Sequence, residues 1–251
     1  MISKLDINCD LGEFYGMYDE RRDSKIMPFI SSCNIACGFH SGDPVAIHKT
    51  IRLAMEHEVA IGAHPSYPDL QGFGRRVMNL STDELEACVL YQVSALKGMT
   101  ESLGGRLHHV KPHGALYNHA AKNEETAMGI VKAVVQIKED MLLYAPAHSV
   151  LSEVAQDAGL RVCNEVFADR RYENDLSLRS RKLEGAVLHQ EEEVIGQIAG
   201  FLKGEVVTYE GLDLPIKADT VCLHSDTEGA EELAGAIHKF LEKQNVEIVA
   251  C

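Results

Sequence analysis

Ionisable and metal-capable side chains end five short apolar stretches of this sequence. The stretches cover residues 5–10, 59–64, 109–113, 162–165 and 221–226. At or just beyond their ends stand Asp10, Glu13, His64, Lys111, His113, Glu165, Asp169, His224 and Asp226. Such side chains transfer protons in enzymes, and parallel β/α units gather their chemistry at the carboxyl ends of the strands. The sequence therefore predicts an α/β barrel with an enzyme pocket at these ends.

The first stretch alternates between apolar and polar side chains, as a strand with two different faces does. Its polar face carries Asp6, Asn8 and Asp10, which in a closed barrel would point inward, toward the pocket. The fourth stretch keeps the same period with His109, Lys111 and His113. Because a buried lysine is costly without a partner, Lys111 should pair with Asp10 or Glu165. A structural ion pair is the alternative to a catalytic role for Lys111.

The loop of residues 34–44 joins a predicted strand to a predicted helix. It begins at Asn34 and contains two glycines, His40 and the helix cap Asp43. Backbone amides and His40 could therefore converge on an anion at the start of the helix.

Two further loops carry candidate binding residues. In residues 64–76, Arg75 can hold a carboxylate in bidentate fashion, whereas Arg76 is better explained as part of a surface ion pair. In residues 111–118, Pro112 indicates a strand end, because proline cannot donate a ladder hydrogen bond. The other candidates in these two loops are His64, Ser66 and Tyr117.

Helical patterns fill most of the gaps between the predicted strands. Asp43 and Pro44 provide an N-cap and a first-turn proline, and Ser81 with Glu84 forms a capping box. Further helices are expected near 124–138, 149–158, 190–203 and 229–243. Further strands are expected near 29–35, 141–146 and 246–250.

Two segments depart from this rhythm. Residues 205–218 read as a hairpin, and residues 167–188 form a polar, irregular insertion with several arginines, among them Arg181. A long insertion beside a strand end is more typical of an active-site loop than of a linker. The sequence shows no repeat or domain boundary, so we expect one barrel domain over residues 1–251.

The composition argues against several classes of function. Lys and Arg total 24 against 38 Asp and Glu, and the net charge of −14 argues against binding to nucleic acid or an anionic membrane. With no membrane-length apolar run, no signal peptide and no cysteine framework, we expect a cytoplasmic protein with reduced cysteines, Cys163 among them. The phosphate-loop, dinucleotide-binding and nucleophile-elbow motifs are also missing.

Four histidines near strand ends could bind a divalent metal. They are His40, His64, His113 and His224. None shares a short metal-binding motif such as His-Glu-x-x-His, so spacing alone favours a pocket without a metal. Whether a metal binds stays open.

These clusters, in this order, closely resemble those of the LamB/YcsF family of A-type 5-oxoprolinase subunits. The matching stretches are residues 5–13, 32–44, 62–76, 110–118, 165–172 and 222–226. The resemblance implies a distorted TIM-like β/α barrel similar to the glycoside hydrolase/deacetylase superfamily. It also implies ATP-dependent opening of the 5-oxoproline (pyroglutamate) lactam to L-glutamate, together with two partner subunits of the B and C types.

The sequence departs from the family pattern at three places. Phe14 follows Glu13 where the family usually has glycine, and Leu176 replaces a common glycine in the insertion. The last motif, often His-Gly-Asp-Asn, reads His-Ser-Asp-Thr at residues 224–227. These changes bear on loop conformation and substrate fit, and they leave the acid and base residues in place.

The implied reaction suggests roles for the candidate residues. The catalytic set is Asp10, Glu13, His40, Lys111, His113 and Glu165. The substrate-binding set is Asn34, His64, Ser66, Arg75, Tyr117, Asp169, Arg181, His224 and Asp226. ATP would be a co-substrate handled with a partner subunit, because the phosphate loop is missing.

Two other functions remain as alternatives. One is a non-catalytic accessory subunit that delivers substrate to the complex. The other is a metal-dependent carbohydrate deacetylase or glycan hydrolase, which would bind a divalent ion tightly and act alone.

Overall fold

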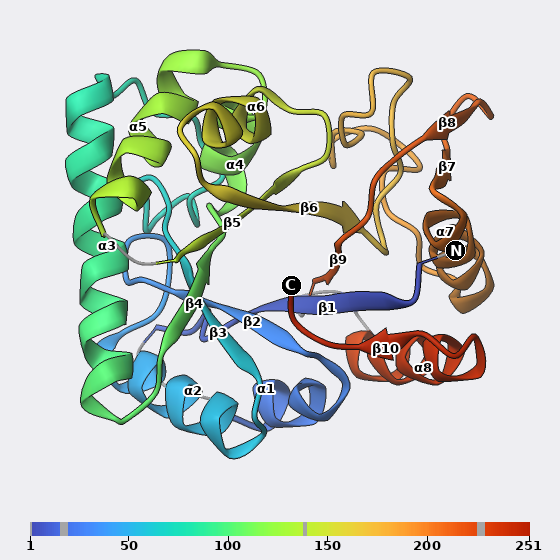
Figure 1. The fold of residues 1–251 in the computed structure, drawn as a ribbon, viewed down its shortest axis with the longest axis horizontal. Coiled ribbons are helices and arrows are strands. Elements are labelled where there is room, and N and C mark those ends of the chain that lie inside the picture. Colours follow the sequence, from blue (N-terminus) through green and yellow to red (C-terminus); the bar gives the residue numbers. More distant parts are fainter. Residues whose placement is uncertain (1, 16–19, 138–139, 225–228) are drawn as a thin grey trace.

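Seven parallel strands close into a barrel in the computed structural model, which describes residues 2–15, 20–137, 140–224 and 229–251 (Figure 1). Their order is β1-β2-β3-β4-β5-β6-β9, and β9 pairs back with β1. The strands are β1 (Lys4–Leu11), β2 (Ser32–Ala36), β3 (Ala60–His64), β4 (Leu107–Val110), β5 (Leu142–Pro146), β6 (Arg161–Phe167) and β9 (Thr220–Leu223). The predicted TIM-like barrel is confirmed.

Helices connect most of the strands and surround the barrel (Figure 1). They are α1 (Glu20–Ile26), the 3-10 helix η1 (Met27–Phe29), α2 (Pro44–Glu56), α3 (Thr82–Ser102), α4 (Gly114–Ala120), α5 (Glu124–Gln136), α6 (Val150–Asp157), α7 (Glu191–Lys203) and α8 (Ala230–Lys243). Asp43 caps α2, and Ser81 with Glu84 forms the predicted capping box of α3. Every helix predicted from the sequence is present close to its expected bounds.

Strand β1 divides its side chains between the barrel interior and the helical layer, as the alternation predicted. Its apolar residues belong to the large hydrophobic core. Its polar residues reach side chains of other strands, since Asp6 accepts from Ser32 of β2 and Asn8 donates to Glu165 of β6. The interior of the barrel is therefore polar along the whole of β1.

Strand β4 ends earlier than predicted, at Val110 instead of His113. The physical reason is Pro112, which has no amide to continue the ladder. The chain stays extended nonetheless, because the amides of Lys111 and His113 donate to carbonyls of β3 and of the loop after it, over 2.9 and 2.8 Å. The period of two thus persists beyond the strand and keeps both side chains on the pocket side.

Other elements also differ from the sequence predictions. Helices α1 and α4 were not predicted, because each is short and has only a brief apolar pattern. The predicted last strand is reduced to β10 (Glu247–Ile248), which pairs with the start of β1. Strand β9 ends at Leu223, and Asp226 lies outside the described residues.

The predicted hairpin and insertion are both present. The hairpin consists of the antiparallel strands β7 (Glu205–Val207) and β8 (Asp213–Pro215). The insertion after β6 is irregular, and two isolated bridges, Arg170 to Val187 and Tyr172 to Leu178, tie it together.

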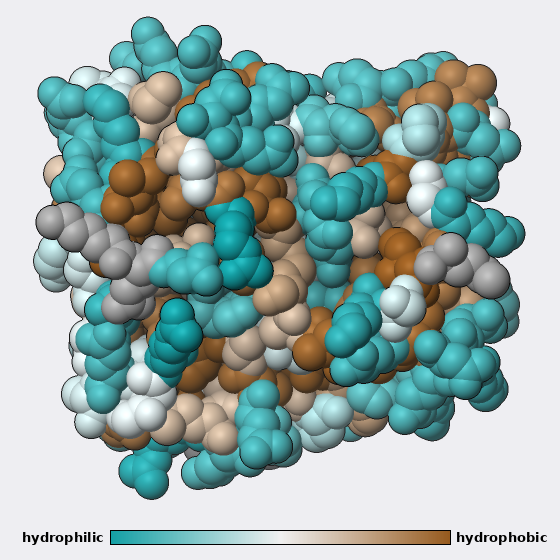
Figure 2. Space-filling view, viewed as in Figure 1, coloured by the Kyte–Doolittle hydropathy of each residue, from teal (hydrophilic) through white to brown (hydrophobic). Residues whose placement is uncertain are grey.

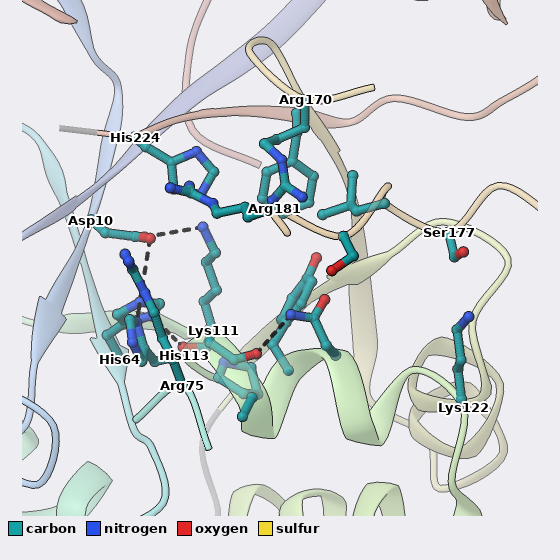
Figure 3. A pocket seen from close by; sticks show the side chains of 18 of the residues that line it. Asp10, His64, Arg75, Lys111, His113, Lys122, Arg170, Ser177, Arg181 and His224 are labelled. Atoms are coloured by element: carbon teal, nitrogen blue, oxygen red, sulfur yellow. Dashed lines mark hydrogen bonds and ion pairs between the residues drawn. The ribbon is translucent and has the colours of Figure 1, made fainter. Parts of the chain in front are cut away.

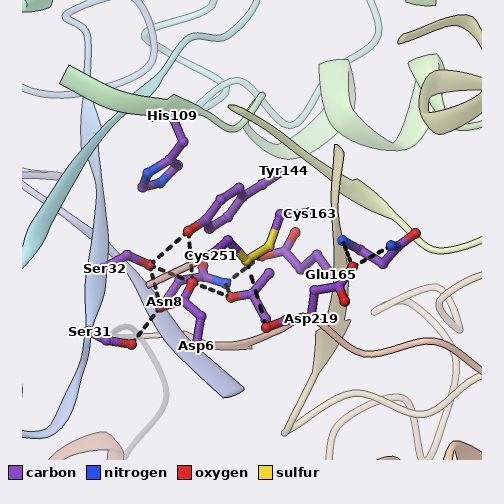
Figure 4. The surroundings of a disulfide bond; sticks show 12 residues. Asp6, Asn8, Ser31, Ser32, His109, Tyr144, Cys163, Glu165, Asp219 and Cys251 are labelled. Carbon is purple, nitrogen blue, oxygen red and sulfur yellow. Dashed lines mark hydrogen bonds between the residues drawn. A yellow bond between two sulfur atoms is a disulfide. The ribbon is translucent and has the colours of Figure 1, made fainter. Parts of the chain in front are cut away.

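A disulfide joins Cys163 of β6 to Cys251, with their Cα atoms 6.3 Å apart (Figure 4). The chain returns after β10 to the amino end of β6, which brings the two residues together. The expectation that Cys163 is a reduced, unpaired thiol is therefore wrong.

A layer of hydroxyl groups surrounds Asp6 near the same end of the barrel (Figure 4). The Asp6 carboxylate accepts hydrogen bonds from Ser31, Ser32, Tyr144 and Thr220 at 2.5, 2.7, 2.8 and 2.6 Å. Burial raises the pKa of Asp6 above its usual value, although these hydroxyls act in the opposite direction. A polar network of neutral donors around one acid thus occupies this end of the barrel interior.

Hydrophilic side chains cover most of the periphery on the face shown in Figure 2, with apolar side chains between them. In the part of the chain that the structure describes, no helix is both long and apolar enough to cross a membrane.

Candidate active site

A cavity of about 470 Å³ opens at the carboxyl ends of the barrel strands (Figure 3). Its walls come from the ends of β1, β3, β4, β6 and β9, from α4 and from the insertion. The predicted site residues that line it are Asp10, Glu13, His64, Arg75, Lys111, His113, Tyr117, Arg181 and His224. The cavity therefore lies where the sequence predicted a pocket.

Lys111 is the central cation of this site and is only 2% exposed. Its Nζ lies 2.8 Å from Glu165 Oε1 and 3.0 Å from Asp10 Oδ1. It also lies 3.1 Å from Asn8 Oδ1 and 3.0 Å from Cys222 Sγ. Burial lowers the pKa of Lys111, but the carboxylates outweigh burial and hold that pKa well above its usual range. Lys111 thus stays charged and meets both predicted partners.

Asp10 is held through both of its oxygens (Figure 3). Oδ1 accepts from Lys111 and from Asn34 Nδ2, the latter at 2.9 Å, and Oδ2 lies 3.4 Å from His64 Nε2. Burial would raise the pKa of Asp10, but His64 and Lys111 outweigh it and bring the pKa well below its usual value. The carboxylate is therefore a fixed negative charge at the cavity wall.

Glu165 lies behind the cavity wall, fully engaged by side chains. Oε1 accepts from Asn8 Nδ2 at 2.9 Å and from Lys111, and Oε2 accepts from the Tyr117 hydroxyl. Burial and the neighbouring carboxylate raise the pKa of Tyr117 well above its usual value, so its hydroxyl keeps its proton. Glu165 therefore positions Lys111 and Tyr117.

Three histidines from three different strand ends meet Glu13. His113 Nδ1 lies 3.0 Å from His64 Nε2 and 3.4 Å from Glu13 Oε1. His40 Nε2 lies 3.0 Å from the same Glu13 oxygen, and the His40 ring stacks on the His113 ring with centroids 3.8 Å apart. Burial lowers the pKa of His40 and of His113 well below the usual value. Their four ligand atoms lie within 4.8 Å of one another and could hold a metal ion.

A second group could also hold a cation. Asp10, Cys222 and His224 bring their ligand atoms equally close together. In this group, however, Lys111 already lies against both Asp10 and the Cys222 sulfur. A second positive charge at the same place would be repelled.

The opposite wall of the cavity is cationic. Figure 3 shows Arg170 and Arg181 of the insertion across the cavity from His64 and His113, with Lys122 at the rim. The guanidinium of Arg170 is fixed by donating to backbone carbonyls of the insertion itself. Such a wall would attract an anionic ligand.

His224 and Asp169 form a pair at the end of β9. His224 Nδ1 lies 3.0 Å from both oxygens of the buried Asp169. Burial raises the pKa of Asp169, but His224 outweighs this and the pKa lies below its usual value. A carboxylate that accepts from Nδ1 leaves Nε2 as the nitrogen available for proton exchange.

The remaining predicted site residues lie behind the cavity wall. They are Asn34, His40, Ser66, Glu165 and Asp169. The Ser66 hydroxyl donates to the carbonyl of Tyr67 at 2.8 Å, within its own loop. Arg76 forms the predicted surface ion pair, with Asp69.

Several residues that shape the cavity were not among the predicted site residues. They are Lys122, Phe167, Arg170, Ser177, Ser180 and Lys182 on the walls, and Asn8 and Cys222 beside Lys111. A signal existed for Asn8, because it shares the polar face of β1 with Asp10. Lys122 carried no signal, because it comes from the segment after an unpredicted helix.

The sequence profile of the LamB/YcsF family matches residues 5–251. This chain belongs to the LamB/YcsF family. The protein named as the A-type subunit of 5-oxoprolinase in Acinetobacter baumannii (strain ACICU) is 51% identical over 245 residues, covering 97% of this chain and 96% of that protein. Its namesake from Bacillus cereus (strain AH187) is 46% identical over 251 residues, covering 99% of both.

A solved structure has the same fold as this LamB/YcsF chain. It is the lactam utilization protein from Thermus thermophilus, with a TM-score of 0.92 and 43% identity, covering 99% of this chain and 100% of that one. Leu176, at the position where the resemblance led us to expect glycine, has a φ of 62°. A positive φ is a conformation that glycine adopts without strain.

Proposed function

We propose that this chain is the lactam-binding subunit of an ATP-dependent 5-oxoprolinase, which opens 5-oxoproline to L-glutamate. The cavity is the main support, because the Asp10 carboxylate, which Lys111 fixes, faces a wall of arginines. A small anionic substrate can bind to such a wall through its carboxylate. The ionisable side chains at the strand ends are suited to proton transfer. The relatives are named as a 5-oxoprolinase subunit and as a lactam utilization protein, and both names agree with this proposal.

ATP is needed because a lactam is a resonance-stabilised amide. Transfer of the γ-phosphoryl group to the lactam oxygen releases ADP and makes the ring carbon electrophilic. One water then adds to this carbon, the C–N bond breaks with a proton delivered to nitrogen, and γ-glutamyl phosphate results. A second water releases phosphate and leaves L-glutamate. If phosphate left before the C–N bond broke, the lactam would re-form.

Productive opening therefore requires a proton at the ring nitrogen. His224 is suited to take a proton from the attacking water and return it to this nitrogen, because Asp169 fixes its Nδ1. Arg75 or Arg181 would hold the substrate carboxylate. Lys111 would act by fixing Asp10 and by its charge, since its Nζ is already bonded to protein atoms.

The nucleotide would be handled with partner subunits of the B and C types. The sequence has no phosphate loop, and the relatives are named as one subunit of an oxoprolinase. The cationic wall of Arg170, Arg181 and Lys182 would then receive the phosphorylated lactam.

The test is glutamate and ADP formation from 5-oxoproline and ATP. We expect equimolar products only when this chain is combined with both partners. Absence of glutamate from a demonstrably assembled complex would overturn the proposal.

A matched pair of variants separates catalysis from an accessory role. His224→Asn should reduce turnover of the assembled complex by about 10²-fold or more, because it removes a proton carrier. His48→Gln, at an exposed position on α2, should leave turnover unchanged. A fully active His224→Asn complex would favour the non-catalytic accessory role.

A further inference from the structure

Four residues of the barrel interior lie at one level on neighbouring strands. Strand pairing places Asp10 of β1 opposite Asn34 of β2, and Asn34 opposite Gly62 of β3. Gly62 in turn lies opposite His109 of β4. The His109 ring lies over Gly62, where a Cβ atom would collide with the imidazole. His109 thus reaches across β3 and places its Nε2 atom 2.8 Å from Asn34 Oδ1.

The orientation of the Asn34 amide follows from its neighbours. Lys111 Nζ only donates, so the Asn8 atom that lies 3.1 Å from it is the amide oxygen Oδ1. One end of the Asn34 amide lies 2.7 Å from this oxygen and 2.9 Å from Asp10 Oδ1. Both of these neighbours accept, so this end must be the nitrogen. The oxygen of Asn34 therefore points at His109.

The protonation of His109 follows from the same contacts. An amide oxygen only accepts, so His109 Nε2 donates to Asn34. Burial lowers the pKa of His109 well below its usual value, so the ring is neutral and its Nδ1 carries no proton. This nitrogen accepts from His108 Nδ1 at 3.1 Å, and the ring stacks on Tyr144 with centroids 3.9 Å apart (Figure 4). His109 is therefore held in one tautomer and one orientation.

We propose that His109 is a positioning residue, which acts through Asn34 to hold the Asp10 carboxylate in place. His109 is fully buried and is not among the residues that line the cavity, so it does not touch substrate. Without the Nε2–H group, the Asn34 oxygen would be buried without a donor, which is costly. A turned amide would instead present this oxygen to Asp10, which also only accepts, so the carboxylate would be displaced.

This inference deepens the proposed function, because Asp10 lines the cavity and belongs to the proposed catalytic set. Its effect on turnover rests on the proposed function, whereas the hydrogen bonds do not. The hydrogen bonds are therefore measured on the isolated chain, without substrate, ATP or partner subunits.

NMR spectroscopy of the ¹⁵N-labelled chain, assigned by triple-resonance experiments, tests these hydrogen bonds. At neutral pH, His109 should show a protonated Nε2 and an unprotonated Nδ1. The Nδ2 protons of Asn34 should exchange slowly with solvent, because they are buried and donated to Asp10 and Asn8. A proton on His109 Nδ1 at neutral pH would overturn the proposal.

Two substitutions of His109 separate its hydrogen bond from its packing. In His109→Leu the donor is lost, so exchange of the Asn34 amide protons should accelerate at least about tenfold. His109→Gln keeps an N–H donor at a similar distance from the backbone and should restore most of the protection. Equal exchange rates in the wild type and in folded His109→Leu would overturn the proposal.

The variant Gly62→Ala displaces the imidazole without removing it. The added methyl group would take the place of the ring, so the Asn34 amide should lose protection as in His109→Leu. The matched control is Gly98→Ala on α3, where no described atom of another segment lies within 4 Å of the added methyl group. Gly98→Ala should exchange as the wild type does.

Circular dichroism would establish that each variant folds. If His109→Leu does not fold, Gly62→Ala replaces it, and the tautomer of His109 in the wild type is measured in either case. Wild-type protection of the Asn34 amide in folded Gly62→Ala would contradict the proposal.

Turnover of the assembled complex tests the effect on Asp10. His109→Leu should lower kcat for glutamate formation about 10–100-fold, as misplaced catalytic groups do, and should change KM less than about threefold. His109→Gln should recover most of kcat. Unchanged kcat in a His109→Leu complex whose Asn34 amide has lost protection would overturn the positioning role. Absence of glutamate from the wild-type complex would overturn the proposed function alone, and the NMR measurements would then decide this inference.

Discussion

Asp6 and Asp10 lie on the same face of the same strand, but their surroundings give them opposite properties. Asp6 is surrounded by neutral hydroxyl groups, and burial raises its pKa. Asp10 is also buried but lies against His64 and Lys111, which bring its pKa down. Neighbouring charge, and not burial, therefore distinguishes the two ends of the barrel interior.

This difference shows that one end of the barrel interior serves packing, whereas the other end carries the charged groups of the candidate site. The strand alternation places both acids inside, whereas cations such as Lys111 and Arg181 come from segments beyond the strand ends. The layer around Asp6 can then be neutral, while the layer around Lys111 keeps fixed charges next to an open cavity. The predictions below address this contrast.

Removal of the Lys111 charge should have the largest effect. In Lys111→Met, Asp10 and Glu165 lose their cation, and stability should fall by about 3–5 kcal/mol, as for other broken buried pairs. Turnover of the complex should fall about 10²–10³-fold, as when a charged or polar donor is deleted from an active site. Urea unfolding and glutamate formation measure the two effects.

The matched control is Lys122→Met at the cavity rim. Lys122 forms an exposed pair with Asp175, and such pairs contribute little to stability. Equal stability of Lys111→Met and the wild type would contradict the description of Lys111 as the central cation.

Asparagine substitutions at the two acids should respond to pH in opposite ways. Below about pH 3.9, Asp6 makes its full contribution to the free energy of unfolding. This contribution is lost as the pH rises through the pKa of Asp6 in the folded protein, which is raised. The contribution of Asp10 is full above about pH 3.9 and is lost as pH falls through its lowered folded pKa. The stability of Asp6→Asn relative to the wild type should therefore decrease as the pH falls, whereas the relative stability of Asp10→Asn should increase.

Urea unfolding of the isolated chain between pH 3 and pH 7 measures these differences. Each pH unit by which a pKa is displaced is worth about 1.4 kcal/mol, so the opposite slopes are measurable. Parallel slopes for the two variants would show that the acids have similar surroundings.

Substitutions of the two neighbouring arginines in the loop after β3 should differ in their effect on the KM for 5-oxoproline. This effect should be smaller than the loss of turnover in Lys111→Met. Arg75 lines the cavity, so Arg75→Ala should raise the KM for 5-oxoproline by about 10–100-fold, the value of a lost charge-assisted hydrogen bond. Arg76 is paired with Asp69 on the surface, so Arg76→Ala should leave KM unchanged. Equal KM values for the two variants would exclude Arg75 from carboxylate binding.

Features that depend on local periodicity could be predicted from the sequence. The alternation in β1 predicted a polar barrel interior, and cap residues such as Ser81 predicted the helix starts. The cost of an unpaired buried lysine predicted the partners of Lys111. The motifs of the strand-end loops predicted the family.

Features that depend on distant segments could not be predicted in this way. His40, His64 and His113 come from the ends of three different strands, so no sequence spacing revealed their convergence. Two of them lie within hydrogen-bond distance of backbone carbonyl groups, which the sequence does not distinguish. Alternation likewise could not tell Asp6 from Asp10, because the difference comes from residues of other segments, some of which, such as Tyr144 and Lys111, lie more than a hundred positions away.

The hydroxyl layer around Asp6 has a consequence for the release of product. This layer lies in the barrel interior on the side away from the cavity, whose lining includes Lys111, Arg75 and Arg181. Under the proposed reaction, glutamate must leave past the same arginines that attract the lactam. Glutamate keeps the carboxylate that the lactam has and gains a second carboxylate together with an ammonium group, so its net charge is the same. Because it keeps the carboxylate that the arginines bind, it should compete with incoming substrate as it accumulates and slow its own formation.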